Sequence, residues 1–144
     1  MNRATLMTVL WRLDGKPQPK SDKSFTDVAA DAYYAEAVRW AGEAGITTGY
    51  TDGSFGVGDS VTRQQLAVFL YRYAEYKGMD VSGGAELGGY ADVEKVASWA
   101  KQAMGWANAE GYVTGSTGNL LLPEGEATRA QTATILMRLI EDMK

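Results

Sequence analysis

Cysteine and histidine are both absent from the 144 residues of the chain. Without cysteine, the protein has no disulfides, no thiolate metal sites and no cysteine nucleophile. Without histidine, it lacks the base of Ser-His-Asp hydrolases and the commonest zinc ligand. Carboxylates, lysines and tyrosines are the acid–base groups that remain, so the composition disfavours most hydrolase mechanisms.

Positive charge and long apolar runs are also scarce. The formal net charge is −4, so no general positive field draws the chain to nucleic acid, and we expect no nucleic-acid partner. No run approaches the ~18 apolar residues of a membrane span, and the first residues lack the order of a signal peptide. We therefore expect no membrane insertion. With 45% hydrophobic residues, residues 1–144 are expected to form one domain with its own core.

One pattern, built on arginine, occurs three times. In each copy an arginine is followed by a leucine seven residues later and by a second arginine nine residues later. The first arginines are Arg3, Arg63 and Arg129, and the second are Arg12, Arg72 and Arg138. Apolar residues three, seven and ten positions after the first arginine, with one exception, predict a core-facing helix in each copy. Three copies indicate an internal repeat, whose units bury their apolar faces against one another.

The ends of these helices carry further signals. Thr62 with Gln65, and Thr128 with Gln131, predict capping boxes. The first arginine faces the positive end of the helix dipole, which costs a few tenths of a kcal/mol up to ~1. The second arginine is expected near the helix C-terminus, where its charge is favourable. An adverse arginine placed three times at a helix start indicates an anion close by, either a carboxylate of the protein or one of a ligand.

Between the arginine helices, two stretches align almost residue for residue. Residues 25–28 match 90–93, and an aromatic and alanine-rich helix is expected from Tyr33 and again from Trp99. Gly45 and Gly111 are expected to end these helices. Turn-forming pairs follow, at 52–53 and 118–119. A calcium loop at the first pair is disfavoured, because the alternating carboxylates of such a loop are missing.

This order resembles the S-layer homology repeat: Phe-x-Asp-Val, a helix ending in Gly-Ile, a Gly-x-x-x-Gly-x-Phe turn, and Thr-Arg opening a long helix. The resemblance covers the chain, with 1–14 as the last helix of a truncated first repeat, 24–77 as the second repeat and 90–143 as the third. It implies an all-α, pseudo-threefold domain. The arginine helices would form a central three-helix bundle, and the short helices with their turns would form outer prongs.

The resemblance also implies a function. In that family, grooves between prongs hold a secondary cell-wall polysaccharide that bears pyruvate ketals on its sugars. The chain is then a non-catalytic module, without metal or cofactor, that anchors a larger exported protein in the cell wall or S-layer of a bacterium. The family's arginine is carried onto Arg3, Arg63 and Arg129. Its motif ends in Glu, whereas Gln65 and Gln131 stand there in this chain, which changes the local charge balance.

Two further pairs of residues are candidates for the site. Tyr33 and Trp99 can each offer an apolar face to a sugar ring, or can fill the core. Asp27 and Asp92 can line the groove, or can serve as caps, turn formers or arginine partners.

The repeat order suggests how grooves would be assembled. If each lies between one arginine helix and the Asp-Val segment of the next repeat, Arg3 faces the 25–40 region and Arg63 faces the 90–106 region. Arg129 would then lack its partner.

Two other function classes remain open. One is a protein–protein or self-assembly module, in which the same prongs contact a partner surface. In addition, the face left by the truncated first repeat is open to pairing with another copy. The other is a glycosidase, which needs two carboxyls at a defined separation. The available carboxylates show no pair whose spacing is distinctive, so we do not expect an enzyme. They are Glu36, Glu43, Asp52 and Asp92.

Overall fold

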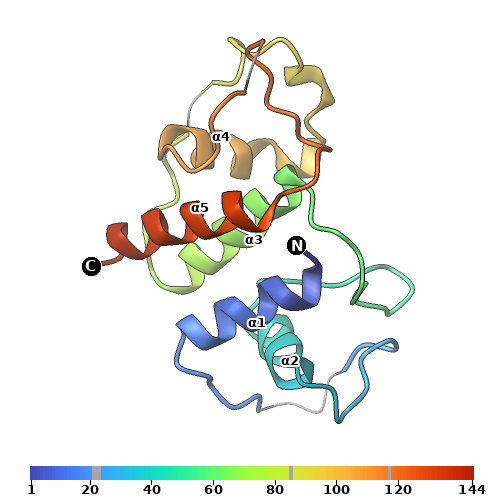
Figure 1. The fold of residues 1–144 in the computed structure, drawn as a ribbon. Coiled ribbons are helices and arrows are strands. Elements are labelled where there is room, and N and C mark those ends of the chain that lie inside the picture. Colours follow the sequence, from blue (N-terminus) through green and yellow to red (C-terminus); the bar gives the residue numbers. More distant parts are fainter. Residues whose placement is uncertain (21–23, 85, 117) are drawn as a thin grey trace. The chain divides into compact units, whose positions relative to one another are not determined.

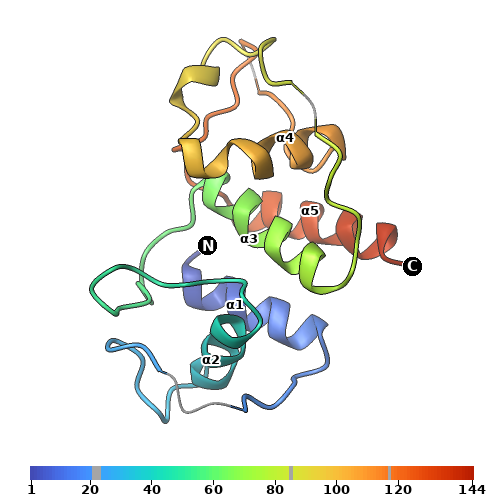
Figure 2. The ribbon, with the colours of Figure 1, turned by 180° about the vertical axis from the view of Figure 1, so that it is seen from behind.

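The computed structural model describes residues 1–20, 24–84, 86–116 and 118–144. It divides into two compact units, which we call unit 1 (Met1–Ser60) and unit 2 (Val61–Lys144). Within the described residues, all regular structure is helical, and Figures 1 and 2 show long irregular segments between the helices. None of these helices has the length and apolar composition needed to cross a bilayer. The all-α prediction is confirmed, and the pseudo-threefold arrangement stays a prediction.

Unit 1 is built on α1 (Arg3–Leu13) and α2 (Ala35–Glu43), which pack against each other. The first helix begins at Asn2, whose side-chain oxygen accepts the N–H of Thr5 at 2.8 Å, as an N-cap does. The apolar stripe predicted on α1 is buried, and it meets the alanine-rich face of α2. The core of unit 1 includes Leu6, Met7, Leu10, Ala37, Val38, Trp40, Ala41, Ile46 and Phe55.

Unit 2 repeats this arrangement and adds one α-helix and two short 3-10 helices. Its elements are α3 (Arg63–Tyr76), the short 3-10 helices η1 (Val93–Lys95) and η2 (Ser98–Ala100), α4 (Lys101–Ala109) and α5 (Arg129–Asp142). The α4 helix packs on α3 as α2 packs on α1. Both predicted capping boxes are present, at the starts of α3 and α5.

The second arginines are not all where we expected them. Arg12 lies in the last turn of α1, but α3 and α5 have no basic residue in their last turns. The predicted C-terminal position is therefore wrong for Arg72 and Arg138. Both helices continue because Tyr73 and Leu139, one residue further on, still face the core.

The two short aromatic helices begin later than predicted. The α2 helix starts at Ala35 and α4 at Lys101, so Tyr33 precedes α2 and Trp99 lies in η2. Tyr33 is 70% exposed and Trp99 is 59% exposed, which excludes the alternative that they fill the core. Helical spacing shows which residues share a face, but it does not show where the helix begins. Both helices begin two residues after the aromatic residue from which the spacing was counted.

The segment after α2 is tightly built around Gly49, which yields a stability prediction. Gly49 has a φ of +72°, and a Cβ there would lie 2.5 Å from the Phe25 ring and 2.8 Å from the Ser54 carbonyl oxygen. Gly49→Ala is expected to destabilise unit 1 by more than about 3 kcal/mol, because left-handed strain and overpacking add. Gly45 has a φ of +78°, and a Cβ added there would meet no atom within 4 Å beyond its chain neighbours, so Gly45→Ala is expected to cost about 1 kcal/mol. Urea unfolding of both variants measures the difference, and equal losses would contradict the close contact.

Candidate functional site

In unit 1, Arg3 is a buried side chain that holds the turn after α2. It is 4% exposed, and its Nε donates to the carbonyl oxygen of Phe55 at 2.8 Å. Its guanidinium carbon lies 4.7 Å from the centre of the Tyr50 ring and 4.8 Å from that of Phe55. Such cation–π contacts compensate part of the cost of burying the charge.

Asp27 holds the same turn from its other side. Its carboxylate accepts the backbone N–H groups of Phe55 at 2.7 Å, Gly56 at 2.9 Å and Val57 at 3.1 Å. Burial acts to raise the pKa of Asp27, but these three N–H donors outweigh it and bring the pKa below its ordinary value. Phe55 is therefore fixed twice, its carbonyl by Arg3 and its N–H by Asp27.

Unit 2 contains the same arrangement around Leu121. Arg63 donates from Nε to the carbonyl oxygen of Leu121 at 2.8 Å and from Nη2 to that of Thr114 at 3.0 Å. Asp92 accepts the N–H groups of Leu121 and Leu122, both at 2.8 Å. The Leu121 N–H is the main cause of the lowered pKa of Asp92. In each unit, one residue of the turn joins the arginine helix to the Asp-Val segment.

The linking role of Phe55 and Leu121 was not predicted from the sequence. The signal available was their constant offset of 66 residues, which marks them as equivalent positions but carries no information about backbone hydrogen bonds.

These contacts explain an arginine at a helix start. Burial lowers the pKa of Arg3 and of Arg63, while nearby groups, including Asp27 and Asp92, act in the opposite direction. A guanidinium stays charged under such a shift at neutral pH. The unfavourable helix dipole is thus offset by carbonyl acceptors and by the field of an aspartate. Arg129 starts α5 in the same way but is exposed.

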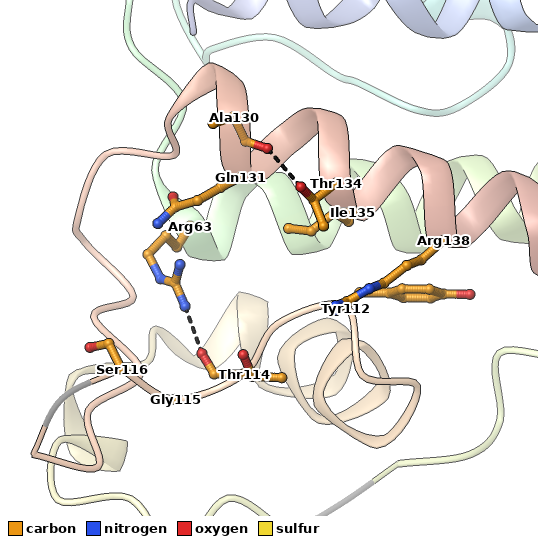
Figure 3. Close-up of a pocket in the computed structure, with 10 residues that line it drawn as sticks. All are labelled: Arg63, Tyr112, Thr114, Gly115, Ser116, Ala130, Gln131, Thr134, Ile135 and Arg138. Carbon is orange, nitrogen blue, oxygen red and sulfur yellow. Dashed lines mark hydrogen bonds between the residues drawn. The ribbon is translucent and has the colours of Figure 1, made fainter.

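A groove of about 400 Å³ lies in unit 2 beside α5 (Figure 3). One wall is α5, the other is the segment that follows α4, and Arg63 lines it from the start of α3. We call it the Arg63 groove. None of its lining residues carries a carboxylate, so it is suited to an anion and not to a cation. They are Arg63, Tyr112, Thr114, Gly115, Ser116, Ala130, Gln131, Thr134, Ile135 and Arg138.

Trp99 lies close to this end of α3. The N–H of Ala97 donates to Oε1 of Gln64 at 3.0 Å, which ties the segment before α4 to the first turn of α3. Trp99 follows two residues later with its ring exposed. At the equivalent position in unit 1, Tyr33 is also exposed and makes an edge contact with Tyr34, with ring centres 5.0 Å apart.

Three of the four carboxylates considered for a glycosidase are engaged with the backbone. Glu43 accepts the N–H of Lys20 at 3.0 Å, and Asp52 accepts that of Ser54 at 2.9 Å. Asp92 holds the Leu121 turn as described above. A glycosidase acid needs a raised pKa, whereas the pKa values of Asp52 and Asp92 are both lowered. The arrangement therefore does not favour catalysis by these groups.

Replacing the Asp92 carboxylate tests whether Leu121 is fixed through its N–H as well as through its carbonyl oxygen. In Asp92→Asn, the amide keeps one acceptor but turns an NH₂ group toward a backbone N–H. We expect the Leu121 and Leu122 amides to exchange with solvent about tenfold faster or more, because a charge-assisted acceptor is lost. Asp52→Asn is the matched control and should leave both rates unchanged. Equal protection in Asp92→Asn would show that Asp92 does not hold the turn.

The lowered pKa values of Asp27 and Asp92 also predict a pH dependence. When a folded-state pKa lies below the unfolded value, the unfolded state binds more protons, so this stabilisation is complete above the unfolded value and is lost as pH falls through the folded one. The unfolded value is near 3.8. The difference in unfolding midpoint between the wild type and Asp92→Asn should be constant from about pH 7 to 5 and should shrink below about pH 4. A difference that grows on acidification would contradict the assignment.

Comparisons with known proteins agree with these repeats. The family model of the S-layer homology domain matches residues 24–67 and 89–133. The chain is 31% identical over 97% of its length to the surface-layer 125 kDa protein of Lysinibacillus sphaericus, of which it spans 11%. It is 30% identical over 97% to an endoglucanase of Bacillus sp. (strain KSM-635), of which it spans 15%.

A third relative is named for anchoring. The cellulosome-anchoring protein of Acetivibrio thermocellus is 25% identical over 98% of the chain, which spans 32% of that protein. The chain thus covers less than a third of each of these relatives, and it corresponds to a region that cell-surface proteins and enzymes share. The chain belongs to the S-layer homology family, whose non-catalytic domains anchor proteins at the cell surface.

Proposed function

We propose that this chain binds a secondary cell-wall polysaccharide through pyruvylated sugars, and so holds a larger exported protein at the bacterial surface. The observation that carries the proposal is the Arg63 groove, a hollow of about 400 Å³ lined by arginine and by no carboxylate. A ketal carboxylate is an anion that such a groove accepts, because an arginine can form charge-assisted hydrogen bonds with it.

The lining of the groove also suits the rest of a sugar. The hydroxyls of Ser116 and Thr134 are within the lining, and Ile135 and Tyr112 add apolar surface. Sites for small polar ligands combine these features, with a few polar groups to set orientation and apolar walls to add contact area. Arg63 uses two of the five N–H donors of its guanidinium on Leu121 and Thr114, so others remain for the ligand.

The predicted site residues then take different roles. Arg63 would contact the carboxylate, while Arg3 is covered by aromatic rings and mainly holds its turn. Asp27 and Asp92 would support the site by fixing the two turns. Arg129 is exposed and would add positive charge at the start of α5. The exposed rings of Tyr33 and Trp99 would each lie against a sugar ring.

The decisive experiment is cosedimentation with purified sacculi of Lysinibacillus sphaericus, untreated and stripped of wall polysaccharide by hydrofluoric acid. We expect binding to untreated sacculi only. Trp99→Ala should weaken it about tenfold, which is typical of losing an aromatic contact residue at an interface. Tyr76→Ala, an exposed aromatic at the end of α3, is the control and should bind as the wild type does.

Arg63→Gln is a second variant for the same assay, and its helical content is checked first by circular dichroism because Arg63 also holds the Leu121 turn. It should lose at least as much affinity as Trp99→Ala. Equal binding to stripped sacculi would point to peptidoglycan and would contradict the polysaccharide proposal. Absence of binding to either preparation would contradict anchoring by this chain.

A second function, self-assembly, is favoured by one observation on α5. Ala67 of α3 is buried in unit 2, and Tyr71 is half-buried and contacts the Trp106 ring of α4 at 5.7 Å between centres. The equivalent residues of α5, Ala133 and Met137, are exposed, Met137 by 61%. We infer that two copies of the chain pair through this face, in the isologous manner of most homodimers.

Sedimentation equilibrium tests the pairing. The wild type should shift from monomer to dimer as its concentration rises, and Met137→Glu should remain monomeric, because a charge would be buried without a partner. Leu122→Glu, at another exposed apolar position, is the control and should dimerise normally. A wild type that stays monomeric at all concentrations would exclude self-assembly through α5.

A further inference from the structure

A second cationic side chain, Arg138, lines the Arg63 groove. We expected it at the C-terminus of its helix, as a partner of the helix dipole. It lies instead before the last turn of α5, and it is exposed to solvent. The dipole effect falls off within the last turn, so it does not explain an arginine here.

Arg138 is held in position by one hydrogen bond. Its Nη1 donates to the carbonyl oxygen of Gly111 at 2.9 Å, at the turn that ends the α4 segment. Figure 3 shows its side chain reaching from α5 toward Tyr112. A guanidinium has five N–H donors in a fixed plane, so a single bond orients the group and leaves donors for a ligand.

The two arginines lie at different places along the groove. Arg63 lines it from the start of α3, near the first turn of α5, where Gln131 also lines it. Arg138 follows Gln131 by seven residues, which is about 10 Å along a helix axis. Figure 3 shows the side chains of Arg63 and Arg138 apart along the groove, with Thr134 and Ile135 between them, so the arginines are placed to contact different anionic groups.

The charges around Arg138 are arranged unequally. On its other side is a separate hollow of about 350 Å³, lined by Arg138 with Glu110, Met137, Glu141 and Asp142. Asp142 accepts the hydroxyl of Tyr112. The Arg63 groove has no carboxylate in its lining, so an anion inside the groove meets two arginines and no lining group of its own sign.

From this geometry we propose that Arg138 forms a second anion subsite, and that the groove takes an acidic oligosaccharide with anionic groups on two separate sugar residues. The inference rests on the proposed function of the groove and deepens it. The anions share one chemistry, an oxygen-bearing negative group on a sugar chain, whether a ketal carboxylate or a phosphate.

The test measures affinity for untreated Lysinibacillus sphaericus sacculi with Arg138→Gln, Arg138→Lys and the control Arg12→Gln. Arg12 is exposed on α1 in unit 1 and lines neither hollow. Arg138→Gln should bind about tenfold more weakly, as expected for a lost charge-assisted hydrogen bond. Arg138→Lys should recover part of the loss, because it keeps the charge. Arg12→Gln should bind as the wild type does.

The salt dependence of binding and the affinity of a double variant show whether the two arginines bind two anionic groups or share one. Between about 20 and 300 mM NaCl the Debye length falls from roughly 20 Å to roughly 6 Å, and the affinity of Arg138→Gln should fall less steeply than that of the wild type. The losses of Arg63→Gln and Arg138→Gln should multiply in the double variant, as independent contacts do. A double variant no weaker than the worse single one would mean one shared anion and would overturn the proposal.

Failure of this inference is distinguishable from failure of the anchor function. If Arg138→Gln matches the wild type in affinity and salt dependence while Arg63→Gln loses binding, the second subsite is excluded and the anchor proposal stands. If the wild type itself does not bind, both are overturned. Mild acid, which removes pyruvate ketals, identifies the anion: loss of the Arg138 effect indicates ketal carboxylates, and its persistence indicates phosphate, either of which supports the second subsite.

Discussion

The two units depend on one local interaction, in which a single turn residue is held through both of its backbone groups. An arginine at a helix start takes the carbonyl oxygen of Phe55 or Leu121, and an aspartate from the preceding segment takes the N–H. Both hydrogen bonds are strong, because each involves a charged side chain. The interaction connects the arginine helix of one repeat to the turn of the next, so each compact unit combines parts of two repeats.

This interaction also places the candidate ligand groups. Arg63 lines the groove with its Nε and Nη2 fixed on Leu121 and Thr114. Its guanidinium is therefore already oriented and partly desolvated before a ligand arrives. A preorganised donor loses little conformational entropy on binding. Because of the same contacts, a substitution of Arg63 affects both stability and binding. Trp99 and Arg138 are exposed, so their substitution is expected to affect binding with little effect on stability.

The sequence was sufficient to predict the elements that are repeated along the chain. Helical spacing and the Thr-x-x-Gln signals predicted α3 and α5 with their capping boxes, because both signals are local. The positions of Arg72 and Arg138 relative to the helix ends were predicted wrongly, because α3 and α5 continue past them, with Tyr73 and Leu139 still facing the core. Local spacing does not encode how distant segments meet in space. It therefore did not predict the hydrogen bonds to the backbone groups of Phe55 and Leu121, or the exposure of Trp99.

The charge of the groove depends on which residue, Gln or Glu, completes the capping box of α5. Where the S-layer homology motif has Glu, this chain has Gln, and Gln131 lines the groove while its Oε1 accepts the N–H of Thr128 at 3.1 Å. An amide completes the box as well as a carboxylate does. A Glu at position 131 would place a negative charge beside Arg63 and compete with an anionic ligand. With Gln, the helix start is still capped, and no residue that lines the groove carries a negative charge beside Arg63 and Arg138.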